Sequence, residues 1–306
     1  TLLDQGHAVI GVDIVNDYYD VRMKQARQKQ LLSDKFTFYQ LDIASIKDMA
    51  PIFEKHKIDT IIHLAAQAGV RYSVTNPWAY EHSNNLGTLT MFECARKHNI
   101  RILYASSGSV YGATTPPFKE SQECITPVSL YGATKRANEL LAHSYYKMYG
   151  VKSVGLRFFT VYGTYGRPDL AMFIFTKKIL KGEPISVYNG GDMVRTFTHI
   201  TDIVAGIQKI IEHDELECEL FNLSGGEAVT LNRYIELIEE RVGQKAQKNM
   251  MPMQPGDVRE AVADITKAKQ ILNYEPQMTL DKGISEFTNW FMKNKEWLLE
   301  LEDGKQ

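Results

Sequence analysis

Short apolar runs alternate with stretches of helical periodicity through the first half of the chain. The apolar runs lie at 8–13, 36–42, 60–66, 101–107 and 153–159, and the helical patterns lie at 20–33, 45–56, 77–98 and 129–149. Nearly continuous apolar runs are typical of parallel strands that are covered on both faces. Strands that alternate with helices predict βαβ units, and therefore an α/β fold with a doubly wound parallel sheet.

Beyond residue 160 the expected elements become shorter and more mixed. PISVYNGG and VRTFTHI predict two short strands around a Gly-Gly turn, and helices are expected at 201–213, 231–242 and 264–272. We therefore expect a dinucleotide-binding domain over 1–160 and a smaller mixed α/β binding lobe over 161–306. Part of the stretch 193–212 is expected to return to the sheet of the first domain.

The composition excludes several classes of function. Charges nearly balance at a net −2 without a basic cluster, so we expect neither a nucleic acid nor a membrane as a partner. No apolar run approaches the roughly 20 residues that span a bilayer. The eight histidines form no i, i+4 pair, which argues against a zinc site. Three scattered cysteines, Cys94, Cys124 and Cys218, favour a reducing compartment, and we expect a cytoplasmic protein.

Asp13 is a candidate ribose-binding residue because it ends the first apolar run, HAVIGVD. A carboxylate at the end of the second strand of a dinucleotide fold accepts hydrogen bonds from the adenosine ribose and repels a 2′-phosphate, which favours NAD over NADP. An aspartate in a turn or at a helix N-cap is the alternative. Such an acid normally follows a glycine-rich phosphate loop, and only six residues precede this run. We expect about twenty further residues upstream, with an apolar strand and a G-x-x-G-x-x-G loop.

The segment YGATK places Tyr131 and Lys135 one helical turn apart, on one helix face. A phenol titrates near 10 in water, and a neighbouring ammonium can lower that pKa enough for the phenol to act as a base. YxxxK is a short motif that chance also produces, but of sixteen tyrosines only this one has a lysine four residues on. It follows an apolar run that ends in Ser106-Ser107, and the Ser107 hydroxyl can bind the same substrate oxygen or simply cap a turn.

HLAAQAG (63–69) ends another apolar run in small residues. Small side chains let a backbone approach a cofactor closely, although tight packing explains the same pattern.

Four segments, ASSGSVYG, YGATK, RFFTVYG and RTFTHITDIV, follow one another as in the extended short-chain dehydrogenase/reductases, the NAD-dependent epimerases and dehydratases. Within that family the chain most resembles the UDP-glucuronate 4-epimerases. The segments that carry this likeness are NDYYD, AAQAGVRYSVTNPWAY, RFFTVYGTYGRPDLAMF and GDVREAVADITKAKQIL. The resemblance implies a Rossmann-type domain that lacks its first strand and glycine loop here, a UDP-sugar-binding lobe, and a homodimer formed by helices 77–98 and 129–149.

The resemblance also implies residue roles toward NAD. Asp13 would bind the adenosine ribose, and Asp42 and Ile43 would flank the adenine. The pyrophosphate and nicotinamide ribose would lie along Leu64, Ala65, Ala66 and Gln67, with Asn84 nearby. Phe159 would pack beside the nicotinamide, and Lys135 would hold its ribose.

Toward the substrate, Ser107 and Tyr131 would hold the sugar 4-oxygen, with Tyr131 as the base and Lys135 as its tuner. Thr160 would lie on the sugar-phosphate side, Tyr188 would stack on uracil, and Arg195 and Arg259 would pair with the diphosphate. The 4-keto intermediate of a uronic acid is a β-keto acid that can lose carbon dioxide, so its carboxylate needs a clamp. Arg167 is the candidate, with Arg71 or Ser109 as helpers. The alternatives are a surface salt bridge for Arg195 and carbonyl capping for Arg167.

Some positions depart from the family pattern and leave other functions open. Gly108 stands where the family usually has Ser or Thr, and Thr164 and Tyr165 replace the common Pro and Trp. A UDP-N-acetylglucosamine or UDP-glucose 4-epimerase, a decarboxylating relative, and a non-catalytic nucleotide-sugar-binding protein are the alternatives. A 4-epimerase of UDP-glucuronate would make UDP-galacturonate for acidic polysaccharides.

Overall fold

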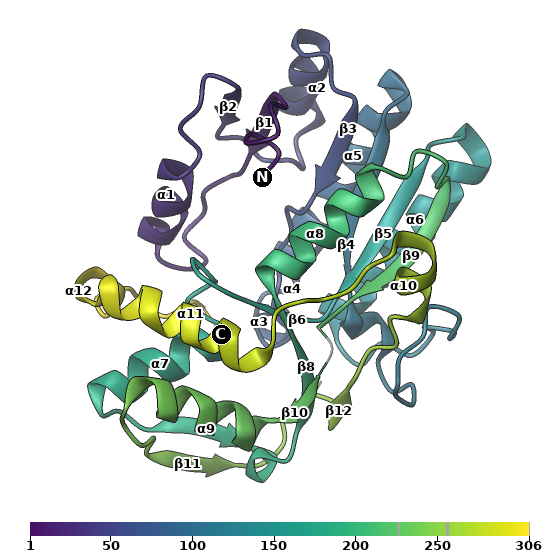
Figure 1. The fold of residues 1–306 in the computed structure, drawn as a ribbon. Helices are drawn as coiled ribbons and strands as arrows, with labels where there is room; N and C mark the ends of the chain where they lie inside the picture. The colour runs from purple at the N-terminus through teal and green to yellow at the C-terminus, as the bar shows by residue number, and fades with distance from the viewer. Residues whose placement is uncertain (226, 255–256, 306) are drawn as a thin grey trace.

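The computed structural model describes residues 1–225, 227–254 and 257–305, and a four-stranded parallel sheet lies at its centre. Across this sheet the order is β3 (Thr60–His63), β4 (Arg101–Ser107), β5 (Ser153–Phe158) and β9 (Cys218–Leu223). A second parallel pair joins β1 (Val9–Val12) to β2 (Phe36–Tyr39). Figure 1 shows that pair beside β3, and over the described ranges no strand connects β1 with β3.

The helices of the first half are α1 (Val21–Lys29), α2 (Ile46–Lys55), α3 (Tyr72–Thr75), α4 (Pro77–Tyr80), η1 (Glu81–Leu86), α5 (Gly87–His98), η2 (Gly108–Tyr111) and α6 (Leu130–Tyr149). The predicted helix 77–98 is continuous but contains the π-helix η1 between α4 and α5. At the start of α6 the Ser129 hydroxyl accepts from the Gly132 amide at 3.1 Å. Gly150, in the left-handed conformation, ends it.

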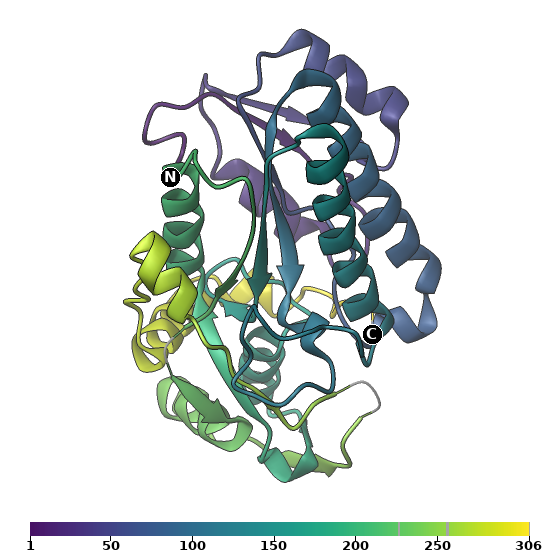
Figure 2. The same cartoon turned by 90° about the vertical axis from the view of Figure 1, so that its right-hand side faces the viewer.

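Alternate residues of β4 point to opposite faces of the central sheet, and helices cover both faces. Ile102 and Tyr104 pack in a cluster with α2, α5 and α6, whereas Leu103 packs with α8 and α10 on the other face. Figure 2 shows α5 and α6 on one side of the sheet and α8 and α10 on the other. Burying each large apolar side chain stabilises the fold by about 1.5–3 kcal/mol. The predicted doubly wound α/β fold is confirmed.

The second half contains two smaller sheets and a separate helical layer. One sheet joins β6 (Thr160–Tyr162), β8 (Val194–His199), β10 (Ala228–Thr230) and β12 (Glu260–Ala261), and another joins β7 (Ile185–Tyr188) to β11 (Lys248–Met251). The helices are α7 (Ala171–Lys181), η3 (Asn189–Gly191), α8 (Ile200–Ile211), α9 (Leu231–Val242), α10 (Thr266–Leu272), α11 (Leu280–Lys293) and α12 (Lys295–Leu298). Their core contains Phe173, Tyr234 and Phe287.

Part of the stretch 193–212 does return to the parallel sheet, because helix α8 packs on one face of that sheet. Strand β9 joins the sheet itself, whereas β8 pairs with β6, β10 and β12. One element was not predicted: α11 forms at 280–293, with Leu280, Ile284 and Phe287 buried at helical spacing. Within the described ranges, no helix is both long and apolar enough to cross a membrane.

Candidate active site

A cavity of about 1230 Å³ lies where the carboxyl ends of β1, β3, β4 and β5 meet the second half of the chain. From the parallel strands its lining includes Asp13, Leu64, Ser107 and Phe159. From the second half it includes Ile174 on α7, Tyr188 at the end of β7, Arg195 on β8 and Leu231 on α9. Single small-molecule sites usually measure roughly 300–1,000 Å³, so this cavity has room for two bound molecules.

At one end of the cavity two carboxylates face the solvent. Asp13 Oδ1 accepts from the Val15 amide at 2.6 Å and lies 3.8 Å from Lys24 Nζ. Asp42 accepts from the Ala44 amide at 2.9 Å and contacts His82 Nε2 at 2.6 Å. Burial alone would raise the pKa of Asp42, but the hydrogen bonds from the His82 ring and the amide outweigh it and lower that pKa.

The small residues after β3 form the next part of the wall, and Asn84 braces them from behind. Leu64, Ala65, Ala66 and Gln67 line the cavity, and Ile43 lies beside them. Asn84 Oδ1 accepts from the Gln67 amide at 2.8 Å, and Asn84 Nδ2 donates to the Gln67 carbonyl at 3.0 Å. Asn84 itself is fully buried and does not line the cavity.

Lys135 and Tyr131 both reach the cavity from α6, but they do not pair. Lys135 Nζ donates to the Ala105 carbonyl on β4 at 2.9 Å, and burial lowers the pKa of Lys135 to about 8. Burial raises the pKa of Tyr131, although a hydrogen bond with Ser107 and the positive charge of Arg167 work against it. The expectation that Lys135 lowers the pKa of this phenol is therefore not met in this structure, because the ammonium is directed at the β4 backbone.

The turn after β4 explains one departure from the family pattern. The Ser107 hydroxyl accepts from the Ser109 amide at 3.1 Å, so it caps η2 as well as facing Tyr131. A Cβ atom on Gly108 would lie 2.9 Å from the Phe159 ring. A serine or threonine at 108 would therefore collide with Phe159, and glycine lets the ring lie against the backbone.

Arg167 forms a charged cluster with Asp169 and Tyr18 in the lining of the cavity. Its Nε donates to Asp169 Oδ1 at 2.9 Å, and its Nη2 donates to Asp169 Oδ2. The Tyr18 hydroxyl donates to Asp169 Oδ2 at 3.2 Å, and the Arg167 guanidinium lies 5.5 Å from the Tyr18 ring centre. Asp169 thus occupies one edge of the planar guanidinium, which leaves the edge formed by Nη1 and the second Nη2 proton for a ligand.

Aromatic rings connect this cluster to Tyr131. Ring centres are 5.0 Å apart between Tyr18 and Tyr72, 6.3 Å between Tyr72 and Tyr80, and 6.2 Å between Tyr80 and Tyr131. The Tyr80 hydroxyl donates to the carbonyl oxygen of Gly69. Packed rings of this kind fix the distance between the phenol and the guanidinium.

The wall from the second half holds the remaining candidates. The Arg71 guanidinium lies 4.5 Å from the Tyr188 ring centre, and Thr160 lines the cavity nearby. The Arg195 guanidinium donates to the carbonyl oxygens of Val194, Val258 and Arg259, at 2.9, 2.6 and 3.1 Å. Its pKa is lowered by burial.

The structure does not bring the Arg259 side chain into the cavity. That side chain is exposed, and the Arg259 backbone carbonyl accepts from the Arg195 guanidinium and from the Val194 amide.

Residues 1–287 match the family described as GDP-mannose 4,6 dehydratase. The chain belongs to this family. A UDP-glucuronate 4-epimerase of Thermodesulfobacterium geofontis is 41% identical over 298 residues, which cover 96% of this chain and 92% of that protein. An uncharacterised protein of Methanocaldococcus jannaschii is 49% identical over 296 residues, 96% of this chain and 90% of that protein.

The fold comparison leads to the same family. The structure of UDP-glucuronic acid 4-epimerase from Bacillus cereus, in complex with UDP-glucuronic acid and NAD, matches with a TM-score of 0.91 at 30% identity. The match covers 96% of this chain and 93% of that chain. The resemblance to the NAD-dependent epimerases and dehydratases is confirmed.

Several cavity residues of this family member were not among the sequence candidates. They are Tyr18, Lys24, Tyr72, His82, Asp169 and Lys178. Two signals could have found some of them: Tyr18 lies in NDYYD and Asp169 in GRPD, segments that already carried the family resemblance. The sequence around His82 gives no sign of a role for it, because its contact with Asp42 depends on the π-helix η1.

Proposed function

We propose that this chain is an NAD-dependent UDP-sugar 4-epimerase that interconverts UDP-glucuronate and UDP-galacturonate. The observation that carries the proposal is the placement of Tyr131, Ser107 and the free edge of Arg167 on one cavity. A base and a carboxylate clamp in one site suit a 4-hydroxyl and a uronic acid. The relatives and the B. cereus structure, whose names carry the same activity, support it.

The residues present fit NAD. The Asp13 carboxylate, 51% exposed at the end of β1, has acceptor oxygens for a ribose. Lys135 has three donors and, over the described residues, one protein acceptor, so two donors remain for ribose hydroxyls. NAD would lie from Asp13 and Asp42 past the small residues 64–67 to Lys135 and Phe159. When bound, NAD would accept the hydride from C4 of the sugar and return it to the ketone, and its positive charge would lower the pKa of Tyr131.

The side chains of the chain would then move one proton and hold the sugar. Tyr131 takes the proton of the 4-hydroxyl as C4 becomes a ketone, with Ser107 bonded to the same oxygen. The ketone next presents its opposite face, and Tyr131 returns the proton to the new 4-hydroxyl. Arg195 and Tyr188 would hold the UDP end, which leaves the sugar ring free to turn.

Arg167 would prevent decarboxylation of the 4-keto intermediate. A β-keto carboxylate loses carbon dioxide when its plane stands perpendicular to the ring carbonyl. A bidentate hydrogen bond from the free edge of Arg167 holds the carboxylate plane, and Asp169 holds the guanidinium plane in turn. Arg71 and Ser109 line the same cavity and would contribute further contacts.

We further infer a cytoplasmic homodimer that provides UDP-galacturonate for acidic polysaccharides. Large apolar side chains are exposed on neighbouring helices: Trp78 on α4, Leu86 on η1, Leu89 on α5 and Leu140 on α6. Helices α5 and α6 pack against each other, so a partner could bury both. The three cysteines are free thiols, which suits a reducing compartment.

Two substitutions in the purified full-length protein test the proposal. Tyr131→Phe should abolish epimerisation while UDP still binds, and retained turnover would remove Tyr131 from its assigned role. Arg167→Ala should reduce turnover of UDP-glucuronate far more than turnover of UDP-glucose. An equal loss on both sugars would contradict the assignment of Arg167 to the carboxylate.

A further inference from the structure

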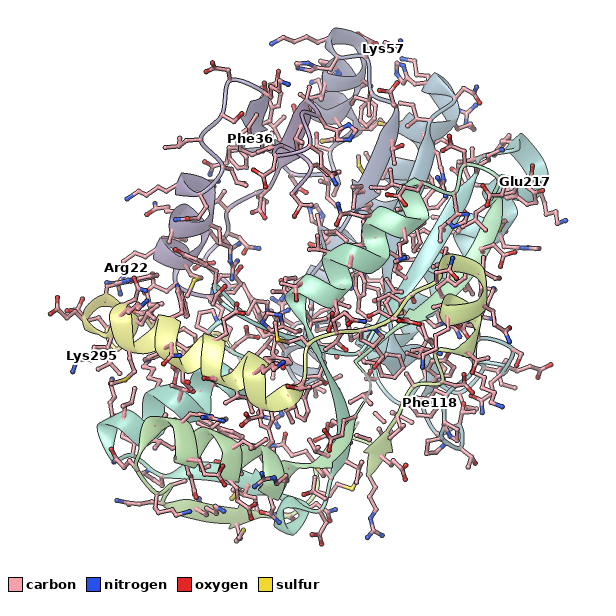
Figure 3. All side chains as sticks on the ribbon, viewed as in Figure 1. Arg22, Phe36, Lys57, Phe118, Glu217 and Lys295 are labelled. Carbon is pink, nitrogen blue, oxygen red and sulfur yellow. The ribbon has the colours of Figure 1, made fainter. Side chains whose placement is uncertain are left out.

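The last described residues, 300–305, lie against residues 17–22, the segment that leads into the start of α1. We name residues 300–305 the strap. The Lys305 amide donates to the Tyr18 carbonyl at 3.0 Å, and the Glu302 amide donates to Asp20 Oδ2 at 3.2 Å. Figure 1 places this end of the chain beside α7 and α11, and Figure 3 shows Arg22 near α12. Arg22 Nη2 donates to the carbonyl of Glu300 at 3.0 Å.

A buried lysine anchors the strap from the opposite side. Lys177 on α7 is 8% exposed, and its Nζ donates to Asp303 Oδ1 at 2.8 Å and also to the Leu301 carbonyl. A buried ammonium is costly unless it is paired and hydrogen-bonded, so these two acceptors tie the strap to α7. Leu301 is 1% exposed and belongs to the core of the second half.

Between these anchors the strap packs directly on Asp169. Gly304 is buried, and a Cβ atom built on it would lie 2.7 Å from the Asp169 Cβ and 3.4 Å from the Tyr19 Cβ. Only a glycine lets the backbone come so close. Asp169 is therefore enclosed by the strap on one side and by Arg167 and Tyr18 on the others.

We propose that the strap is a positioning element for the carboxylate-binding arginine. It presses on Asp169 through Gly304 and holds Tyr18 through its backbone, and Asp169 in turn fixes the plane of the Arg167 guanidinium. The strap thereby contributes to the selection of uronic acid sugars although it lies more than 130 residues from Arg167 in the sequence. This inference rests on the proposed function, because it assigns Arg167 to the sugar carboxylate.

Gly304→Ala is the test, with Glu302→Ala as its matched control in the same segment. Glu302 has an exposed side chain, and its replacement keeps the backbone amide that donates to Asp20. Gly304→Ala should lower kcat/KM for UDP-glucuronate by about tenfold or more, because misplacing a binding group by an ångström can cost up to about 100-fold. The Kd for UDP and the content of bound NAD should stay unchanged, and Glu302→Ala should behave as wild type.

Equal weakening of UDP and UDP-glucuronate binding by Gly304→Ala, or wild-type behaviour of that variant, would overturn the inference. If wild-type protein does not epimerise UDP-glucuronate at all, the proposed function fails, and the strap is then judged by amide hydrogen exchange. In that case the amides of residues 167–170 are compared in the two variants. Faster exchange of these amides in Gly304→Ala than in Glu302→Ala supports the positioning role. Equal exchange in the two variants contradicts it.

Discussion

Lys135 is a buried cation in the wall of the cavity, and its surroundings suit a bound ligand better than an empty protein. It is 3% exposed, no described carboxylate pairs with it, and its one described hydrogen bond is to the Ala105 carbonyl. Burial lowers its pKa to about 8 from a usual value of 10.5. The folded protein without ligand therefore retains this charge at neutral pH at a cost in stability.

That cost predicts a pH dependence of unfolding. Since the folded pKa lies below the unfolded one, the unfolded chain binds the proton more tightly, and stability rises with pH between about 8 and 10.5. The full effect is about 3 kcal/mol, from roughly 1.4 kcal/mol for each pKa unit. Urea unfolding of wild type and Lys135→Met without NAD, at pH 7 and pH 10, checks it. The free energy of unfolding of wild type, relative to that of Lys135→Met, should be higher at pH 10 than at pH 7. The same relative value at both pH values would argue against a buried ammonium.

Asp169 is expected to act through Arg167. Asp169→Asn keeps the side-chain volume but removes the charge that fixes the guanidinium, so turnover of UDP-glucuronate should fall by about tenfold or more. UDP binding should persist, since Asp169 lies at the sugar end. Asp34→Asn, on an exposed residue outside the cavity, is the control. Steady-state kinetics and calorimetric UDP titration measure both quantities. Loss of UDP binding in Asp169→Asn would mean that the whole cavity had changed.

At the scale of elements, α6 is tied to the end of β4 by two successive helical turns. Lys135 bonds the Ala105 carbonyl, and Glu139, one turn later, accepts from the Ser106 hydroxyl at 2.6 Å. Arg157 on β5 donates to both Glu139 oxygens at 2.8 and 2.9 Å, and both side chains are 1% exposed. These contacts fix the strand end that carries Ser107.

Removing one partner of this buried ion pair should lower the free energy of unfolding strongly, and replacing both partners should restore most of it. Glu139→Gln leaves the Arg157 charge uncompensated and should destabilise the protein by about 3–5 kcal/mol. Combining Glu139→Leu with Arg157→Met should recover most of that loss, because an apolar pair carries no desolvation cost. Chemical denaturation of the three proteins measures this. A double variant as unstable as Glu139→Gln would show that the pair acts mainly by packing.

Elements with a clear local pattern could be predicted, and contacts set by long-range packing could not. The apolar runs at 101–107 and 153–159 became β4 and β5, and the helical pattern at 129–149 became α6. The π-helix η1 at 81–86 has no comparable sequence pattern, since Asn84 within it contacts the distant Gln67 backbone.

The same distinction between local motifs and long-range packing applies to the candidate site. Tyr131, Lys135 and Ser107 were identified because each lies in a short motif, and the structure brings all three to the cavity. The partners of Lys135 and Arg167 were not predicted, because Ala105 and Asp169 are chosen by how α6 and the GRPD loop pack in three dimensions. Arg259 does not reach the cavity for the same reason: it lies in a bend just before β12, with an exposed side chain.

For the whole molecule, the exposed apolar residues of α5 and α6 predict the assembly state. Wild type should sediment as a dimer, and Leu89→Arg with Leu140→Arg should sediment as a monomer, because each places a charge on a surface that a partner would bury. Leu32→Arg is the control, since Leu32 is 86% exposed and lies beyond α1. Analytical ultracentrifugation distinguishes these outcomes, and a monomeric wild type would exclude this interface.

The central claim is that one cavity oxidises and reduces C4 of a UDP-uronic acid without losing its carboxylate. The most direct measurement is NMR analysis of the products from purified full-length protein, UDP-glucuronate and no added NAD, with carbon dioxide collected. We predict a mixture of UDP-glucuronate and UDP-galacturonate, no pentose product, and no reaction with Tyr131→Phe. Release of carbon dioxide with a UDP-pentose, or epimerisation of UDP-glucose alone, would contradict the account.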